Sequence, residues 1–408
     1  MMARVRLFVF KVKNMTHNVA VIGANYGDEG KGHITQYMVN RFQKNGEKPL
    51  VVRYNGGAQA GHTVQTADGK RHVFSHFGSG TLLGAPTYWS HYCIVEPRTL
   101  LREFAELRND FDIVPVLFID YRAVVTTPFD VLFNIKLEEL RGSKKHGSVG
   151  LGINETIERS QWPELRLTYG DVINMSYMEL SAKMANIHSY YKHRAVDFHL
   201  PNEIFDKLDY AAVETFYNQI STIVQMPNIV IVKALQVYGL LHSYSLVFEG
   251  AQGLALDEMA GYFPHVTRSR TGLHNIVQIL RANELKLDET VYVTRAYATR
   301  HGDGPFDYPR IIDSRFNPDD KTNVPNPHQG TMRFGRFESY GDVYSRINAD
   351  VYGNNHLWKN ISIAITCLDQ VQSDIRTLMI EGAKFSHHNI YTSNGPTLGD
   401  ITLLERNY

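Results

Sequence analysis

The stretch Asn18-Val-Ala-Val-Ile-Gly-Ala-Asn-Tyr-Gly-Asp-Glu-Gly-Lys-Gly-His33 decides the fold class of this chain. A β-branched apolar strand leads into a glycine-rich turn, and a helical pattern follows over 34–43. This order is typical of a phosphate-binding loop in an α/β sheet, because glycines let backbone N–H groups approach an anion closely. Lys31 adds a positive charge. The acidic pair Asp28-Glu29 would repel phosphate, so it indicates either a bridging metal ion or proton removal beside a transferred phosphoryl group.

Strand and helix patterns alternate along the rest of the chain in the same way. We expect strands at 19–22, 50–52, 114–119, 229–232, 245–248, 290–294 and 361–365. Helical patterns lie at 34–43, 98–107, 130–140, 178–191, 202–224, 273–282 and 343–352. This alternation predicts an α/β fold with a mostly parallel central sheet, helices on both faces and long active-site loops.

Two polar segments rich in Gly, Pro and Asn, 142–160 and 307–341, are expected to be functional loops. We interpret residues 1–14 as an N-terminal extension, with Met15 as an alternative start. Residues 15–408 contain no repeat, low-complexity tract or linker, so we expect a single domain there.

The composition excludes several classes of protein. Lys+Arg and Asp+Glu both number 42 in 408 residues, and a general nucleic-acid binder would carry a basic excess. Cys93 and Cys367 are the only cysteines, which is too few for a disulfide framework or a cysteine-rich zinc site and fits a cytoplasmic protein. No apolar run approaches the length of a membrane span, so no membrane partner is expected.

Further glycine clusters follow later strands. Arg53-Tyr-Asn-Gly-Gly-Ala-Gln-Ala-Gly-His-Thr63 should bring His62 to the same sheet edge as the first loop, where it can donate to developing phosphoryl charge. Phe248-Glu-Gly-Ala-Gln-Gly253 carries Gln252, whose amide has the donor and acceptor needed to read a base edge. A structural histidine and a polar turn are the alternatives.

Two later blocks complete the set, 296–306 and the loop 328–336. In the second, Arg333 and Arg336 can form forked hydrogen bonds to a carboxylate, although solvated surface arginines are the alternative.

Taken together, and in this order, the blocks resemble the adenylosuccinate synthetase family. The matching pieces also include Pro264-x-Val-Thr267, Thr299-Arg-x-Gly-x-Gly-Pro-Phe306 and Leu368-Asp369. The resemblance implies a carbon–nitrogen ligase of purine nucleotide biosynthesis that works through a 6-phosphoryl intermediate. It implies that Asp28 removes the N1 proton of a 6-oxopurine mononucleotide, that His62 stabilises phosphoryl transfer from a nucleoside triphosphate, and that L-aspartate then displaces the 6-phosphoryl group. Gln252 would hold the purine O6.

The resemblance also assigns binding residues. Mg²⁺ would lie at Asp28 and the Gly61 carbonyl. The triphosphate would contact Gly27, Glu29, Gly30, Lys31, Gly32, Gly61, Thr63, Asp369, Ser393, Asn394, Gly395 and Pro396. The purine monophosphate would contact Asn55, Gln59, Ser148, Val149, Arg159, Gln252 and Thr267, and aspartate would contact Thr331, Arg333 and Arg336. The family implies a homodimer in which one arginine, here Arg159, reaches the neighbour's substrate phosphate.

Departures from the family pattern bear on the substrates. Ala58 and Gln59 replace the usual His and Asn, and Cys367 replaces the lysine beside the base-reading Asp369. The lost lysine favours ATP or dATP over GTP as the donor. The lost lysine and the thinned arginine loop, Arg333-Phe-Gly-Arg336, favour a divergent phage-type member that converts dGMP to N6-succino-2-amino-2′-deoxyadenylate, the precursor of 2-aminoadenine. IMP with GTP or ATP is the alternative, and the retained Asp28 supports it, because the phage branch usually has a small residue there.

Two other classes of protein fit less well. A GTPase-like switch would need Walker A spacing, and Gly23 stands too far from Gly30-Lys31 for that. A catalytically inactive relative would not be expected to retain Asp28, Lys31, His62 and Gln252 together.

Overall fold

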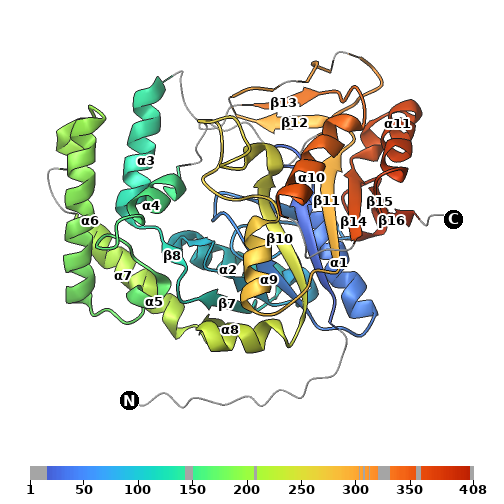
Figure 1. The fold of residues 1–408 in the computed structure, drawn as a ribbon. Helices are drawn as coiled ribbons and strands as arrows, with labels where there is room; N and C mark the ends of the chain where they lie inside the picture. Colours follow the sequence, from blue (N-terminus) through green and yellow to red (C-terminus); the bar gives the residue numbers. More distant parts are fainter. Residues whose placement is uncertain are drawn as a thin grey trace.

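The central sheet sets the architecture. The computed structural model describes residues 16–142, 150–205, 209–302, 304–306, 308–311, 313–319, 331–354 and 360–404. Ten strands pair in the order β16-β15-β14-β11-β1-β10-β2-β5-β7-β9, and every neighbouring pair is parallel except β15 with β16 (Figure 1). The predicted α/β fold with a mostly parallel sheet is therefore confirmed.

The strand bounds show how the sheet is assembled. Its members are β1 Asn18–Gly23, β2 Pro49–Arg53, β5 Thr87–Trp89, β7 Leu117–Asp120, β9 Ile229–Val232, β10 Ser245–Gly253, β11 Glu289–Arg295, β14 Asn360–Thr366, β15 Ile390–Ser393 and β16 Ile401–Leu404. Three small two-stranded pairs are β3 His62–Gln65 with β4 Arg71–Phe74, β6 Ile94–Val95 with β8 Val124–Val125, and β12 Ala298–His301 with β13 Met332–Gly335.

Helices connect the parallel strands. They are α1 Lys31–Lys44, α2 Pro97–Phe111, α3 Pro128–Arg141, α4 Ile153–Arg159, α5 Tyr169–Val172, α6 Tyr177–Asp197, α7 Tyr210–Gln225, α8 Ala234–Leu241, α9 His274–Ala282, α10 Gly341–Gly353 and α11 Ser373–Lys384. Short 3₁₀ turns are η1 Thr81–Leu83, η3 Asn202–Phe205, η4 Leu254–Leu256, η5 Leu368–Gln370 and η6 Leu398–Asp400.

Strand alternation directs side chains to both faces of the sheet. Val19 and Val21 of β1 pack into an apolar cluster with α1, whereas Ala20 and Ile22 pack into the cluster that α8, α9, α10 and α11 form on the other face. A third apolar cluster joins β5, β7 and β9 to α2, α3, α6 and α7. Because both faces are covered, the central strands are buried, which explains their continuous apolar sequences.

Several sequence expectations need correction. The helix expected over 202–224 is two elements, η3 and α7, because the Asp209 side chain caps α7 by accepting from Ala212 N. The expected loop 142–160 contains α4, and the described part of 307–341 contains β13. The strands β5, β15 and β16 were not expected, because three or four residues carry too little periodicity.

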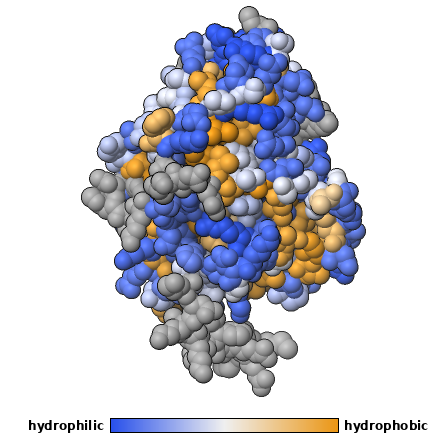
Figure 2. All heavy atoms as spheres, turned by 90° about the vertical axis from the view of Figure 1, so that its right-hand side faces the viewer, coloured by the Kyte–Doolittle hydropathy of each residue, from blue (hydrophilic) through white to orange (hydrophobic). Residues whose placement is uncertain are grey.

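The outer surface is mixed in character. The face that carries α11 and the edge strand β16 shows hydrophobic areas among hydrophilic residues (Figure 2). Phe385, at the end of α11, is 89% exposed. In the part of the chain that the structure describes, no helix has the length and apolar character needed to cross a membrane.

Candidate active site

The loop between β1 and α1 is a cradle for an anion. Gly27, Asp28 and Gly30 all have left-handed backbone conformations, with φ of 91°, 56° and 89°. No described residue accepts a hydrogen bond from the backbone N–H groups of residues 28–33, which run through the loop into the first turn of α1. A series of unpaired N–H groups at the start of a helix binds phosphate well.

The Glu29 carboxylate stabilises this loop by accepting hydrogen bonds from the loop backbone. It is buried, and its Oε1 accepts from Asn25 N at 2.8 Å and Gly27 N at 3.1 Å, while its Oε2 lies 3.1 Å from Lys31 Nζ. The prediction that Glu29 contacts a triphosphate therefore applies only to its backbone N–H. This explains why Glu29 is tolerated in a phosphate-binding loop, because its carboxylate accepts hydrogen bonds from the loop's own N–H groups.

Two neighbouring strands orient the peptide groups of the loop. Arg295 Nε, at the end of β11, donates to Asp28 O at 2.5 Å, and Thr366 Oγ1, at the end of β14, donates to Glu29 O at 2.8 Å. In a planar trans peptide the next N–H points opposite to the carbonyl. The N–H groups of Glu29 and Gly30 therefore point away from these two strands.

His62 lies against the first turn of α1. A Cβ atom at Gly32 would be 3.0 Å from His62 Cβ and 2.7 Å from Ser79 Oγ, so only glycine allows this close packing. His62 Nδ1 is 2.6 Å from Glu249 Oε1, and its Nε2 is buried without a hydrogen-bond partner among the described residues. Burial and the nearby Arg53 cation lower the pKa of His62 to about 4, against the opposing effect of Glu249.

Glu249 is a functional candidate that the sequence reasoning missed. It is fully buried in β10, accepts from Ser79 N at 3.0 Å and from Ser79 Oγ, and lies 3.8 Å from Arg53 Nη1. Burial alone would raise the pKa of Glu249, but His62, Arg53 and Ser79 lower it to about 2. The available signal was a carboxylate directly after the apolar run 245–248, in a strand expected to be buried, because a buried charge requires partners.

Gln252 lies beside the loop that carries Asp28. Gln252 is the next-to-last residue of β10 and has φ of 64°. A Cβ at Gly27 would be 3.4 Å from its Oε1, so its amide lies beside the cradle. The Asp28 carboxylate accepts no hydrogen bond from the described residues. The two groups therefore leave a carboxylate and an amide available beside the cradle.

Oxygen donors for a metal ion are present at the predicted positions. The Asp28 carboxylate is unpaired, and Gly61 is exposed with a carbonyl that no described residue uses. Hard oxygen donors of this kind fit Mg²⁺, which usually takes one or two protein ligands and fills its other positions with water and phosphate oxygens. Among the described residues no cluster of three or more His, Cys, Asp or Glu side chains could form a closed metal cage.

The residues predicted to hold the triphosphate base gather on two adjacent strand ends. Asp369 is exposed on η5, directly after β14. Ser393 ends β15 and its Oγ is 3.2 Å from Nε2 of the buried His33 in α1. Asn394, Gly395 and Pro396 continue from there at the surface. These elements lie beside β11 and β1, so they border the cradle.

Two predicted monophosphate contacts, Asn55 and Arg159, already make hydrogen bonds within the chain. The Asn55 amide is buried and bridges to Ala251, donating from Nδ2 to the carbonyl at 3.0 Å and accepting at Oδ1 from the N–H at 2.8 Å. Arg159 is also fully buried; it binds both carboxylate oxygens of Asp130, at 2.8 Å and 3.0 Å, and two backbone carbonyls. Within the single chain its guanidinium is thus fully engaged, which does not support the prediction that Arg159 reaches a neighbouring subunit.

The other predicted monophosphate and triphosphate contacts are placed as follows. Gln59 is partly buried and its Oε1 has no described partner, and Thr63 Oγ1 is in the same situation. Thr267 is partly buried on the segment after η4. Ser148 and Val149 lie outside the described residues.

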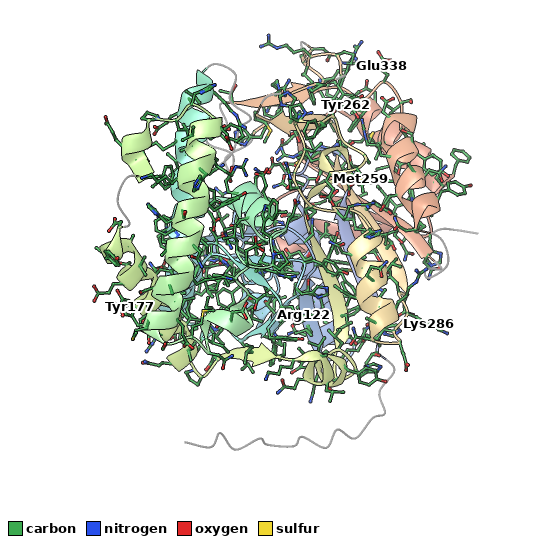
Figure 3. The ribbon with its side chains drawn as sticks, turned by 60° about the vertical axis from the view of Figure 1, so that its left-hand side comes forward. Arg122, Tyr177, Met259, Tyr262, Lys286 and Glu338 are labelled. Carbon is green, nitrogen blue, oxygen red and sulfur yellow. The ribbon has the colours of Figure 1, made fainter. Side chains whose placement is uncertain are left out.

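The predicted aspartate-binding residues lie around the β12–β13 hairpin. Arg333 donates to the carbonyls of Gly304 at 2.9 Å and Gly302 at 2.6 Å, so part of its guanidinium already stabilises the turn. Thr331 and Arg336 are exposed on either side of β13. The hairpin lies at the same end of the molecule as the exposed Tyr262 after η4 and as Glu338 (Figure 3).

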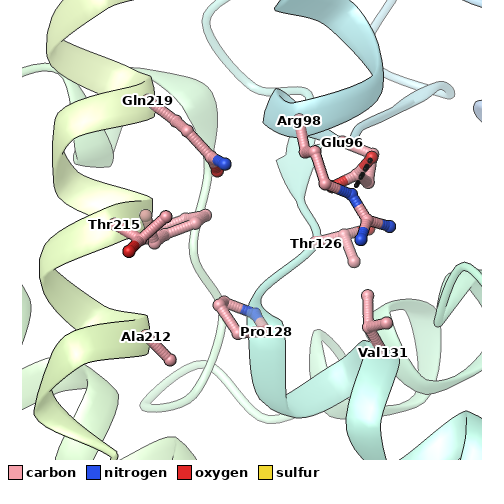
Figure 4. Close-up of a pocket in the computed structure, with 9 residues that line it drawn as sticks. Glu96, Arg98, Thr126, Pro128, Val131, Ala212, Thr215 and Gln219 are labelled. Carbon is pink, nitrogen blue, oxygen red and sulfur yellow. Dashed lines mark ion pairs between the residues drawn. The ribbon is translucent and has the colours of Figure 1, made fainter. Parts of the chain in front are cut away.

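A separate cavity lies elsewhere in the helical part of the molecule. Its volume is about 240 Å³, and Glu96, Arg98, Val131 and Phe216 are among the residues that line it, between α2, α3 and α7 (Figure 4). Arg98 Nε is 3.9 Å from Glu96 Oε2. None of the predicted site residues lines this cavity.

Comparison with known proteins agrees with this geometry. The family model described as adenylosuccinate synthetase matches residues 20–309, which include the cradle, His62, Glu249 and Gln252. The chain belongs to the adenylosuccinate synthetase family. It is 30% identical over 294 residues to adenylosuccinate synthetase of Buchnera aphidicola (72% of this chain, 65% of that protein) and 32% over 305 residues to that of Crocosphaera subtropica (71% and 62%). The match thus spans less than two thirds of these relatives.

Two solved structures share the fold. Fully ligated adenylosuccinate synthetase from Plasmodium falciparum has a TM-score of 0.71 at 16% identity, covering 95% of this chain and 100% of that one. Cyanophage S-2L succinoaminodeoxyadenylate synthetase, bound to dGMP and dATP as an energy donor, has a TM-score of 0.61 at 16% identity, with 95% of both chains covered.

Proposed function

We propose that this chain is a carbon–nitrogen ligase that joins L-aspartate to C6 of a purine mononucleotide, driven by a nucleoside triphosphate. The observation that carries the proposal is the juxtaposition of the unpaired amides of residues 28–33 with Asp28, Gln252 and His62 Nε2. An anion cradle alone would bind a nucleotide. A free carboxylate, an amide and a histidine at its edge equip it for proton removal and phosphoryl transfer.

The side chains divide the chemistry between them. Asp28 takes the N1 proton of the 6-oxopurine, and Gln252 donates to O6, where negative charge then collects. The O6 oxygen attacks the γ-phosphorus of the triphosphate, the bond from that phosphorus to the bridging oxygen breaks, and a nucleoside diphosphate leaves. The amino nitrogen of aspartate then attacks C6 and phosphate departs.

His62 faces the transferred group with Nε2 while Glu249 holds Nδ1. In the free protein its low pKa keeps the imidazole neutral. An incoming phosphoryl anion favours the protonated ring, which can then donate from Nε2 to the developing charge.

A magnesium ion would be held by the Asp28 carboxylate and the Gly61 carbonyl. When bound, it would offset the negative charge of the phosphates, which also explains why a carboxylate is tolerated in the cradle.

We favour dGMP as the mononucleotide and ATP or dATP as the donor, with N6-succino-2-amino-2′-deoxyadenylate as the product. The support is the fold shared with a synthetase that binds dGMP and dATP, together with Cys367 beside Asp369. IMP with GTP or ATP, yielding adenylosuccinate, is the second candidate, and the retained Asp28 favours it. We also infer a homodimer, by analogy with the family.

The test is turnover of the purified protein with aspartate, Mg²⁺ and each of the pairs dGMP/ATP, dGMP/dATP, IMP/ATP and IMP/GTP. Product is followed by absorbance near 280 nm and identified by mass. We expect dGMP with ATP to be turned over fastest. The reverse order, with IMP and GTP ahead, would overturn the substrate assignment, and no succino product from any pair would overturn the ligase itself.

A further inference from the structure

Arg295 occupies a position between two functional loops. It is the last residue of β11, pairs in register with Thr366 of β14, and is only 8% exposed. On one side its Nε donates to Asp28 O at 2.5 Å. On the other side its Nη1 lies 3.5 Å from Tyr297 Oη and its guanidinium stacks 5.9 Å from the centre of the Tyr297 ring.

The contact with Asp28 controls a strained residue. Asp28 is not glycine, yet its φ is 56°, in the left-handed region that most residues avoid. Such a conformation persists only when its surroundings hold it. The Arg295 hydrogen bond fixes the Asp28 carbonyl, and so fixes both the Asp28 carboxylate and the direction of the Glu29 N–H.

The contact with Tyr297 leads to the segment after β14. Tyr297 Oη donates to Gln370 Oε1 at 2.5 Å, and Gln370 is the last residue of η5, next to Asp369. The turn into η5 begins at Cys367, which is also left-handed, with φ of 58°.

Gln370 extends the chain of contacts to a further segment. It binds the backbone of Asp319 through both ends of its amide, accepting from the N–H at 3.1 Å and donating to the carbonyl at 3.3 Å. Its own carbonyl accepts from Asn317 N at 2.8 Å. A displacement of η5 is therefore passed on through Gln370 and Tyr297 to Arg295. Arg295 in turn holds the Asp28 carbonyl by a hydrogen bond.

We propose that Arg295 is a positioning residue that couples the donor-base segment at η5 to the catalytic carboxylate of Asp28, through Tyr297 and Gln370. The inference rests on the proposed function, in which Asp369 holds the base of the triphosphate. A donor base seated on η5 holds Gln370 and Tyr297 in place, and Arg295 then keeps Asp28 in the geometry that removes the N1 proton. A continuous series of side-chain contacts thus couples recognition of the donor base to removal of the N1 proton.

The test compares Arg295→Ala, Arg295→Lys and Tyr297→Phe with the unaltered protein in steady-state kinetics. Misplacing a catalytic group by about 1 Å can cost about 100-fold in rate. We therefore expect Arg295→Ala to lower kcat by about 100-fold, with the KM of the mononucleotide changed less than about 3-fold. Lysine can donate one hydrogen bond to Asp28 O, so Arg295→Lys should recover part of kcat, as should added guanidinium with Arg295→Ala.

Tyr297→Phe keeps the ring but removes the hydroxyl that binds Gln370. We expect it to raise the KM of the triphosphate and to reduce discrimination between ATP and GTP, while the mononucleotide KM stays unchanged. Arg122→Ala is the matched control, because Arg122 pairs with Asp120 at the end of β7, away from η5 and Asp28. We expect this variant to leave every kinetic constant unchanged; Arg122 is labelled in Figure 3.

The outcomes separate the two proposals. If the unaltered protein forms product but Arg295→Ala retains its kcat, or loses it without recovery by lysine and guanidinium, the positioning role is overturned and the ligase stands. A Tyr297→Phe variant with unchanged triphosphate KM and donor preference overturns the coupling to η5. An unaltered protein that forms no product with any substrate pair overturns the ligase, and the inference with it.

Discussion

Replacing Glu249 by glutamine tests the arrangement around His62 most directly. The change keeps the size and shape of the side chain but removes its charge 2.6 Å from His62 Nδ1. At an effective dielectric constant of about 20, unit charges with centres about 4 Å apart interact by about 4 kcal/mol. If His62 must become an imidazolium when the phosphoryl group moves, losing this interaction should lower kcat by about 1,000-fold.

The assay is the rate of succino-nucleotide formation as a function of pH. A histidine that donates from its protonated form loses activity as pH rises through its pKa in the complex. Without Glu249 that pKa falls, so we expect the alkaline limb of the kcat profile to move to lower pH, in addition to the drop in kcat. A purely structural defect would lower the rate without moving the limb.

Protein stability needs a control, because Arg53 is fully buried and Glu249 is its charged neighbour at 3.8 Å. Ser79→Ala is the matched variant: it removes a neutral donor to the same carboxylate and leaves its charge in place. We expect it to reduce kcat less than about 10-fold, as suits the loss of one hydrogen bond. A folded Glu249→Gln protein with unchanged kcat and an unchanged alkaline limb would refute the reasoning.

Three other predictions concern the base, the buried ion pair and pH. Asp28→Asn should lower formation of the 6-phosphoryl intermediate by about 100-fold or more, while the protein still binds the triphosphate in calorimetry. Near-normal turnover would remove Asp28 from the mechanism. Arg159→Met should lower the free energy of unfolding in urea by about 3–5 kcal/mol, because it leaves Asp130 charged and buried. We expect the mononucleotide KM of this variant to be unchanged. A raised KM at full stability would instead support a role for Arg159 in binding the substrate. His33 and His62 have pKa values lowered from 6.5 to about 4 in the folded protein. Between pH 6.5 and pH 4 the unfolded chain therefore binds more protons than the folded one. The free energy of unfolding is at its full value above pH 6.5 and falls toward pH 4, by about 3 kcal/mol for each histidine. His33→Gln should flatten this dependence in thermal unfolding, and an unchanged slope would contradict it.

The parts of the site that the sequence predicted are those in which local order carries the information. A β-branched strand, a glycine turn and a helix pattern are contiguous, so the cradle at 27–32 could be read directly. The parallel sheet followed from alternating strands and helices, and the carboxyl ends of parallel strands must meet at one edge. This is why His62 and Gln252, far apart in the chain, could be expected beside the same loop.

The sequence could not predict the partners of Asn55, Arg159 and Glu29 within the chain. Each has a side chain suited to a phosphate or a metal, but the structure uses it for a buried amide bridge, a buried ion pair or the inner support of a loop. Residue type indicates which bonds a side chain can make. It does not indicate whether a partner from another part of the chain has already taken them.

The sequence by itself determined the α/β class, the phosphate loop and the order of the motifs, because these depend on periodicity and on contiguous residues. Only the tertiary structure decided which polar groups remain free. Glu249 is set against His62 from 187 positions away, and Arg295 reaches Asp28 from 267 positions away. Such pairs are set by which strands lie side by side in the sheet, with β10 and β11 flanking β1, and by the need of buried charges for partners.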